Sequence, residues 1–365
     1  MKIRELTDYL ESFAPLAYQE SYDNCGLIVG SADTEVNRAL IALDCTEDVV
    51  LEAINLGCNL IISHHPIVFT GLKRLNGNSY VERTIILAIQ HQIAIYAVHT
   101  NLDNVRIGVN SGIAQKLNLQ QTQILAPKSA VLGKLVTFVP HDYVGKVKDA
   151  LFLAGAGKIG NYSHCSFSST GSGTFTGNKE AKPFVGERNH LHTEAETRIE
   201  VVFPQFLKGK IVTALKKSHP YEEPAYDLYS LLNENQEVGS GLIGFLPTEM
   251  SPTDFLSYLK QKMELKLIRH TVLAGKNISK VAICGGSGSF LLKQAIACNA
   301  DAYVSADFKY HEFFDAENKL MIADIGHYES EKFTNSLICE LILEKFPTFA
   351  ILLSKIDTNP VNYYL

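Results

Sequence analysis

The sequence lacks the features that mark membrane proteins, disulfide-bonded scaffolds and proteins with a basic nucleic-acid-binding face. No apolar run in its 365 residues approaches the length needed to cross a bilayer. The seven cysteines are scattered and never form a Cys-x-x-Cys pair, which indicates reduced core residues rather than a disulfide framework or a zinc knuckle. The net charge of −6 argues against binding to nucleic acid, although a local basic patch remains open. The start of the chain lacks the apolar segment of a signal peptide, so we expect a cytoplasmic protein.

Several familiar catalytic signatures are also missing. There is no Gly-x-Ser-x-Gly elbow, and no cysteine has an obvious partner that would make it a nucleophile. Residues 285–289, Gly-Gly-Ser-Gly-Ser, join a predicted strand to a predicted helix, where backbone amides can hold a phosphate. The run lacks both the dinucleotide spacing and the lysine of a P-loop, so a tight turn is the simpler interpretation.

The remaining composition is that of a globular chain, with 46% hydrophobic and 20% charged residues. Its length suffices for roughly two or three domains. Apolar runs alternate with amphipathic stretches in residues 1–127 and 238–365, which predicts α/β structure in both parts. We therefore expect two α/β lobes that form one core, interrupted by a different domain at 128–237.

The middle segment has a different pattern of predicted strands and helices. Strand, helix and strand patterns follow one another twice, which predicts a ferredoxin-like α+β domain of roughly one hundred residues. Residues 120–130 lose periodicity and are expected to mark the domain boundary, while 233–241 are expected to form the exit linker. The Gly-, Ser- and Thr-rich residues 170–177 are expected to form a flexible loop.

A short apolar strand, residues 60–62, leads directly to Ser63-His64-His65-Pro66. Pro66 has no N–H group to continue a ladder, so the strand should end with two imidazoles at its C-terminal edge. That edge is where α/β sheets place their sites, and neutral imidazole is the commonest metal ligand among side chains. The two histidines could instead lie on a surface turn and bind no ligand. The His-His pair alone does not decide between a metal site and such a turn.

Other metal-competent side chains also follow apolar runs. Asp103 lies just after the predicted strand 93–98, while His327 and Glu331 are four residues apart at a predicted helix start. Most isolated His-x-x-x-Glu pairs are solvated groups on the protein surface. If both α/β halves share one sheet, three histidines and two carboxylates would meet, a set suited to a pair of Zn, Mn or Fe ions: His64, His65, Asp103, His327 and Glu331.

A second group of residues has weaker support. His99 and His311 follow strand ends and could act as supporting donors or proton shuttles, or be satisfied core histidines. Asp44 also ends a predicted strand and is a further candidate for contact with the site. Asp23 and Asn24 are interpreted as turn residues.

Four motifs together resemble the Nif-three-like family, whose bacterial members are called GTP cyclohydrolase 1 type 2 homologs. They are Asp-Asn-x-Gly-Leu (23–27), Ser-His-His-Pro (63–66), His-Thr-Asn-Leu-Asp (99–103) and His-x-x-x-Glu (327–331). The resemblance covers roughly 1–125 and 240–365. The middle segment, above all His-Pro-Tyr-Glu-Glu-Pro-Ala-Tyr-Asp at 219–227, is similar to the inserted domain of longer members, which resembles nitrogen-regulatory and copper-tolerance proteins.

The resemblance implies a dinuclear metal site with the five ligands named above, zinc being favoured over manganese or iron. It also implies a toroidal homohexamer with its metal sites facing an internal cavity. The expected activity is metal-dependent hydrolysis of a nucleotide or another small molecule, either ring opening of GTP at C8 of guanine with loss of formate or cleavage of a phosphoester. His99 or Glu331 would move the proton. The alternative is a non-catalytic ring that stores or senses metal ions.

Overall fold

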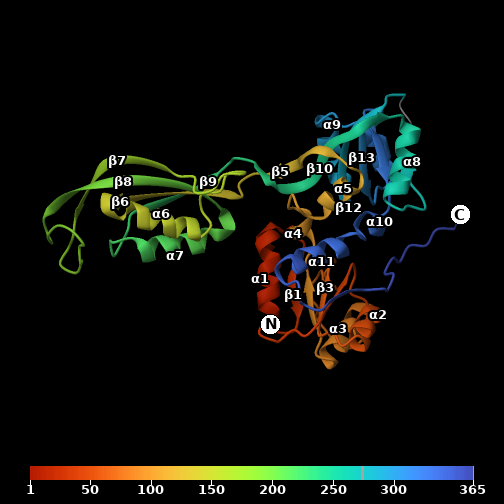
Figure 1. Cartoon of the computed structure of the whole chain (residues 1–365), viewed down its shortest axis with the longest axis horizontal. Helices are drawn as coiled ribbons and strands as arrows, with labels where there is room; N and C mark the ends of the chain where they lie inside the picture. The colour runs from red at the N-terminus through yellow and green to blue at the C-terminus, as the bar shows by residue number, and fades with distance from the viewer. Residues whose placement is uncertain (273–274, 365) are drawn as a thin grey trace. The chain divides into compact units, whose positions relative to one another are not determined.

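The computed structural model describes residues 1–272 and 275–364 and divides the chain into two compact units. Unit 1 combines Met1–Pro127 with Gln236–Leu365, and unit 2 is Lys128–Asn235. Figure 1 shows the chain and labels part of its helices and strands. No helix within the described ranges has the length and apolarity needed to cross a membrane.

The first sheet of unit 1 is built from short strands, and its three central strands are fully buried. Neighbouring strands in this sheet are parallel, except that the first two strands in the order given next are antiparallel. The order is β1 (Gly26–Val29), β4 (Ala94–Ala97), β3 (Leu60–Ser63), β2 (Ala39–Ala42) and β15 (Ile351–Leu353). Burial on both faces explains why the central strands β4, β3 and β2 are nearly continuous apolar runs in the sequence.

The two faces of this sheet are covered by different helices. Ile41 and Ile62 pack on α1 (Ile3–Phe13) and α11 (Thr334–Lys345), whereas Leu40 and Ile61 pack on the opposite side. The helices on that opposite side are α2 (Glu47–Asn55) and α3 (Tyr80–Gln90). Successive strand residues thus alternate between two hydrophobic clusters, as the pleat requires.

The second sheet of unit 1 has six strands. Their order is β11 (Arg269–His270), β14 (Met321–Asp324), β13 (Ala302–Ala306), β12 (Ile278–Ser287), β10 (Asn235–Met250) and β5 (Gln120–Lys128). Helices α5 (Val109–Lys116) and α8 (Pro252–Lys262) contribute to one hydrophobic cluster on this sheet, and α9 (Leu292–Ala297) contributes to another.

The two halves of the core do not share a single sheet; each half contributes strands to two sheets. Strand β15, near the end of the chain, pairs in parallel with β2, and β5 from the N-terminal half lies at the edge of the second sheet. Helices α10 (His327–Glu331) and α11 carry the chain from β14 of the second sheet to β15 of the first. His327 therefore lies where the chain passes between the sheets.

Unit 2 is a single antiparallel sheet with helices α6 (Val144–Leu153) and α7 (Lys208–Ser218) in its hydrophobic cluster. The strand order is β7 (Phe167–Thr176), β8 (Leu191–Pro204), β6 (Leu132–Pro140) and β9 (Tyr226–Leu231). Along the chain the elements run strand, helix, strand, strand, helix, strand.

Three segments expected to be irregular are strands instead. Residues 170–177 fall almost entirely within β7, whose ladder with β8 runs from Phe167 to Thr176. The expected boundary 120–130 is largely β5, and the expected linker 233–241 mostly belongs to β10. Low intrinsic strand propensity is overridden here by ladder pairing, and an edge position lets β5 accommodate Pro127.

Candidate metal centre

His64 is completely buried at the end of β3. Its Nδ1 lies 2.8 Å from the carbonyl oxygen of Val98, so Nδ1 donates that hydrogen bond and Nε2 carries the lone pair. Nε2 points toward two carboxylates, 3.6 Å from Asp103 Oδ1 and 3.8 Å from Glu331 Oε1. The strand end therefore aims the preferred ligand atom of His64 into the cluster.

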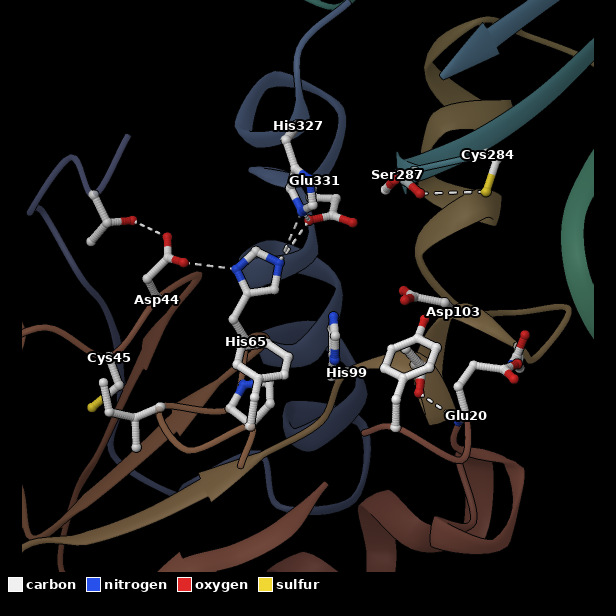
Figure 2. Close-up of a pocket in the computed structure, with 18 of the residues that line it drawn as sticks. Glu20, Asp44, Cys45, His65, His99, Asp103, Cys284, Ser287, His327 and Glu331 are labelled. Carbon is white, nitrogen blue, oxygen red and sulfur yellow. Dashed lines mark hydrogen bonds and ion pairs between the residues drawn. The ribbon is translucent and has the colours of Figure 1, made fainter. Parts of the chain in front are cut away.

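His65 connects Asp44, which lies shortly after strand β2, to helix α10. Its Nδ1 lies 2.7 Å from Asp44 Oδ1, and Thr358 donates a hydrogen bond of 2.6 Å to the other oxygen of Asp44. On the opposite side of the ring, Nε2 lies 3.0 Å from Glu331 Oε2 and 3.3 Å from His327 Nε2. Figure 2 shows this line of contacts from Asp44 through His65 to Glu331.

His327 and Glu331 come from the single short helix α10. His327 Nδ1 lies 2.7 Å from Asp307 Oδ2, and its Nε2 lies 3.1 Å from Glu331 Oε2. The glycine-rich run makes room for this carboxylate, since a Cβ atom at Gly286 would lie 2.3 Å from Glu331 Oε1. The Gly286 amide donates to Ser330 Oγ at 2.9 Å, so it serves packing rather than phosphate binding.

His99 is the N-cap of α4 (Thr100–Asp103), which follows β4, and Asp103 is the last residue of that helix. His99 Nδ1 lies 2.8 Å from Asp23 Oδ1. Asp23 also accepts hydrogen bonds from both the backbone amide and the hydroxyl of Thr100. Its interpretation as an ordinary turn residue is therefore wrong, because its carboxylate holds the loop that carries His99 and Asp103.

The four histidines share one pattern: each Nδ1 is held by an oxygen. The partners are Val98 O for His64, Asp44 for His65, Asp23 for His99 and Asp307 for His327. Such partners fix the tautomer and the ring orientation of metal-ligating histidines. His311, by contrast, is exposed and packs against Tyr310, away from these groups.

Three overlapping groups in this cluster could hold a metal ion, with candidate ligand atoms within 4.8 Å of one another. They are His64–His65–His99, His65–His327–Glu331 and His64–Asp103–Glu331. Within the described residues, His64 Nε2 and Asp103 Oδ1 are buried and have no hydrogen-bond partner. Buried polar atoms are rarely left unpaired, so a cation between these atoms fits the donor set. All five predicted ligands thus lie in one cluster.

Burial and mutual contact separate the pKa values of these groups. Desolvation lowers the pKa of His64 to about 4. Burial also opposes the charged form of His65 and His327, but hydrogen bonds to carboxylates raise their pKa values to about 9 and about 11. Desolvation and the nearby charge of Glu331 raise the pKa of Asp103, whereas the three histidines lower that of Glu331 despite its burial.

Metal binding is expected to release protons and to strengthen as the pH rises from 6 to 9. His65 and His327, with pKa values of about 9 and 11, are protonated at pH 7.5 in the metal-free protein, whereas metal ligation requires neutral imidazole. At least about two protons per chain should be released at pH 7.5. Calorimetric zinc titrations in buffers of different ionisation enthalpy measure this number; zero release and an affinity independent of pH would contradict the assignment.

A cavity of about 690 Å³ opens onto the cluster. His65, His99, Asp103, His327 and Glu331 contribute to its wall. Aromatic side chains line it as well, namely Tyr22, Phe69, Tyr80 and Phe290. The size and the mixture of apolar surface with convergent polar groups are typical of small-molecule sites.

Together the fold and the site define an α/β protein whose strand and helix ends gather imidazoles and carboxylates able to hold a metal ion. Residues 1–360 match the family model described as Duf34/NIF3 (NGG1p interacting factor 3), and the chain belongs to that family.

Similar proteins cover nearly the whole chain. The GTP cyclohydrolase 1 type 2 homolog of Halalkalibacterium halodurans is 39% identical over 97% of this chain and 96% of its own length. The Bacillus subtilis protein of the same name is 38% identical, covering 99% and 98%. The crystal structure of a Bacillus cereus protein related to NIF3 aligns over 100% of this chain and 99% of its own, with a TM-score of 0.86 and 38% identity.

Proposed function

We propose that this chain is a dinuclear metal-dependent hydrolase. The supporting observation is the position of Glu331, whose two oxygens face different groups of ligands. Oε1 lies toward His64, at 3.8 Å from Nε2, and Oε2 lies 3.0 and 3.1 Å from His65 and His327. A carboxylate placed in this way can bridge two ions, one held with His64 and Asp103 and the other with His65 and His327.

The donor set favours particular metals. Imidazole nitrogen with carboxylate oxygen suits zinc, manganese or iron, and zinc is our first choice. When bound, such an ion pair lowers the pKa of water and neutralises charge that develops on the substrate.

We assign proton transfer to His99 because of its surroundings. Its Nδ1 is held by Asp23, and the ring lines the cavity, so Nε2 is placed to take or deliver a proton near the substrate. Glu331 was the other candidate for proton transfer, but its oxygens already contact the histidines. We therefore assign Glu331 to metal bridging and His99 to proton transfer.

The proposed substrates are GTP, opened at C8 of guanine, and phosphoesters. The name of the relatives supports the first, and the aromatic cavity wall can accept a planar base. The test is hydrolysis of GTP and of p-nitrophenyl phosphoesters by zinc-, manganese- or iron-loaded protein. The double variant His64→Ala, His327→Ala should lose activity by about 1000-fold, because several kcal/mol of transition-state stabilisation depend on the ions.

The matched control for that experiment is His311→Ala, which removes an exposed imidazole outside the cluster. It should retain the wild-type rate. Equal rates in the wild type and the double variant would refute the hydrolase. Metal binding without turnover of any of these compounds would favour the non-catalytic ring that stores or senses ions.

The organisation of the chain is part of the proposal. We propose that 128–237 form an inserted ferredoxin-like domain between core segments 1–127 and 238–365. The element order of unit 2 and its strand order β7-β8-β6-β9 support this assignment. We also propose a toroidal homohexamer, which light scattering would report as the mass of six chains. A cytoplasmic location agrees with the seven cysteines, all of which are free.

A further inference from the structure

A second cavity, of about 870 Å³, lies entirely within unit 2. One wall is the glycine-rich part of β7, another is the segment around Phe184, and a third is the turn after α7 that contains Tyr221. Glu196 and Phe138 complete the wall. The function proposed above gives this cavity no role, although it contains part of the 219–227 stretch that the sequence singles out.

Glu196 is a buried acidic residue in the wall of this cavity. It lies on β8 and is only 8% exposed. Gly173 on the neighbouring strand β7 makes room for it, because a Cβ atom there would lie 2.2 Å from Glu196 Oε2. Residues of this type are almost never buried without a partner, because removal of a carboxylate from water is costly.

Tyr221 is held beside this carboxylate by the His219-Pro220-Tyr221 turn. His219 Nε2 lies 2.9 Å from the carbonyl oxygen of Phe138, and its Nδ1 accepts the amide of Tyr221 at 3.1 Å. The Tyr221 hydroxyl is buried beside the Glu196 carboxylate. Burial, followed by hydrogen bonding to Glu196 and by the charge of that carboxylate, raises the pKa of this hydroxyl, so it remains neutral.

Aromatic rings surround these two polar groups. The ring centroid of Tyr221 lies 6.0 Å from that of Phe175 and 6.3 Å from that of Phe184. Phe184 is 48% exposed, so its ring remains available to a ligand. Arg198 also lines the cavity, but its guanidinium is engaged by Glu200 at 2.9 Å.

We propose that this cavity of unit 2 binds a small organic cation with an aromatic or apolar body, of the amine, amidinium or guanidinium class. The cationic N–H groups donate to Glu196, the Tyr221 hydroxyl accepts a further hydrogen bond, and the aromatic faces stabilise the positive charge. The ligand thereby brings a positive charge to the buried carboxylate, which otherwise has the neutral Tyr221 hydroxyl beside it. This inference is independent of the metal centre, since all the residues that carry it belong to unit 2.

The probe is benzamidine, compared with neutral benzamide and anionic benzoate, which have nearly the same size. Calorimetry on the metal-loaded full chain should show one benzamidine per chain, bound at least about tenfold more tightly than benzamide. Glu196→Gln should weaken benzamidine by about tenfold or more and leave the metal content unchanged. The matched control is Glu187→Gln, an exposed acid whose side chain is 87% accessible.

A second variant keeps the proposal testable if Glu196→Gln does not fold. Phe184→Leu alters a half-exposed ring and should fold normally, yet it should weaken benzamidine severalfold by removing one aromatic face. The proposal is overturned if benzamidine does not bind, if benzoate binds equally well, or if benzamidine binding survives both substitutions.

Discussion

Glu331→Gln should reduce the affinity for zinc by at least about 100-fold, the largest effect expected of any single substitution in this protein. The glutamine has the same shape, but it carries no charge and can offer only one oxygen. In the structure the Glu331 carboxylate contacts His65 and His327 and faces His64. One proposed ion therefore loses a ligand, and the other is left at best with a neutral oxygen. Competition with a chromophoric chelator measures the affinity, and elemental analysis measures the metal content.

The control for this substitution lies on the same helix. Glu329→Gln changes an acid that accepts a hydrogen bond from Asn359 at 3.1 Å, on α10 but outside the three candidate metal groups. It should bind zinc with wild-type affinity. Full metal occupancy in Glu331→Gln, or an equal loss in both variants, would show that Glu331 is not the shared ligand.

Metal removal is expected to destabilise the protein by about 5 kcal/mol when each of two ions is present at 100 times its dissociation constant. A ligand at that concentration contributes about 2.7 kcal/mol to the free energy of unfolding. The effect should be large because metal-free protein leaves His64 Nε2 and Asp103 Oδ1 buried without partners. Thermal unfolding with zinc and with EDTA gives the difference directly.

Thermal unfolding of the Glu331→Gln variant with zinc and with EDTA is the matched comparison. If stabilisation arises at this centre, zinc and EDTA should give nearly the same unfolding temperature in the variant while differing by several degrees in the wild type. An identical zinc effect in both proteins would place the stabilising ions elsewhere, and no effect in the wild type would count against a metal centre.

The sequence predicted the positions of the ligand-bearing segments because each follows a short, fully apolar run. His64 follows β3, and His99 and Asp103 follow β4, so strand ends in the sequence became neighbours in space. Their meeting with His327 could not be derived from periodicity. It depends on α10 passing between two sheets, an arrangement that the residue pattern does not reveal.

The supporting carboxylates were harder to recognise. Asp23 and Asp307 have no local signal beyond their position near a turn or strand end, and their roles depend on contact with His99 and His327. Strand β7 was missed for a similar reason. Its Gly and Ser residues have low strand propensity, and the long ladder with β8 that holds them is a tertiary property.

The distance along the chain between the two parts of the centre has a consequence for biosynthesis. His65 and His327 are 262 residues apart, and β2 has one edge that only β15 covers. A nascent chain emerging N-terminus first therefore displays a half-built cluster and an open strand edge until its last segments leave the ribosome. Loading of the complete centre must then follow translation, and truncated chains should be both poor in metal and prone to self-association.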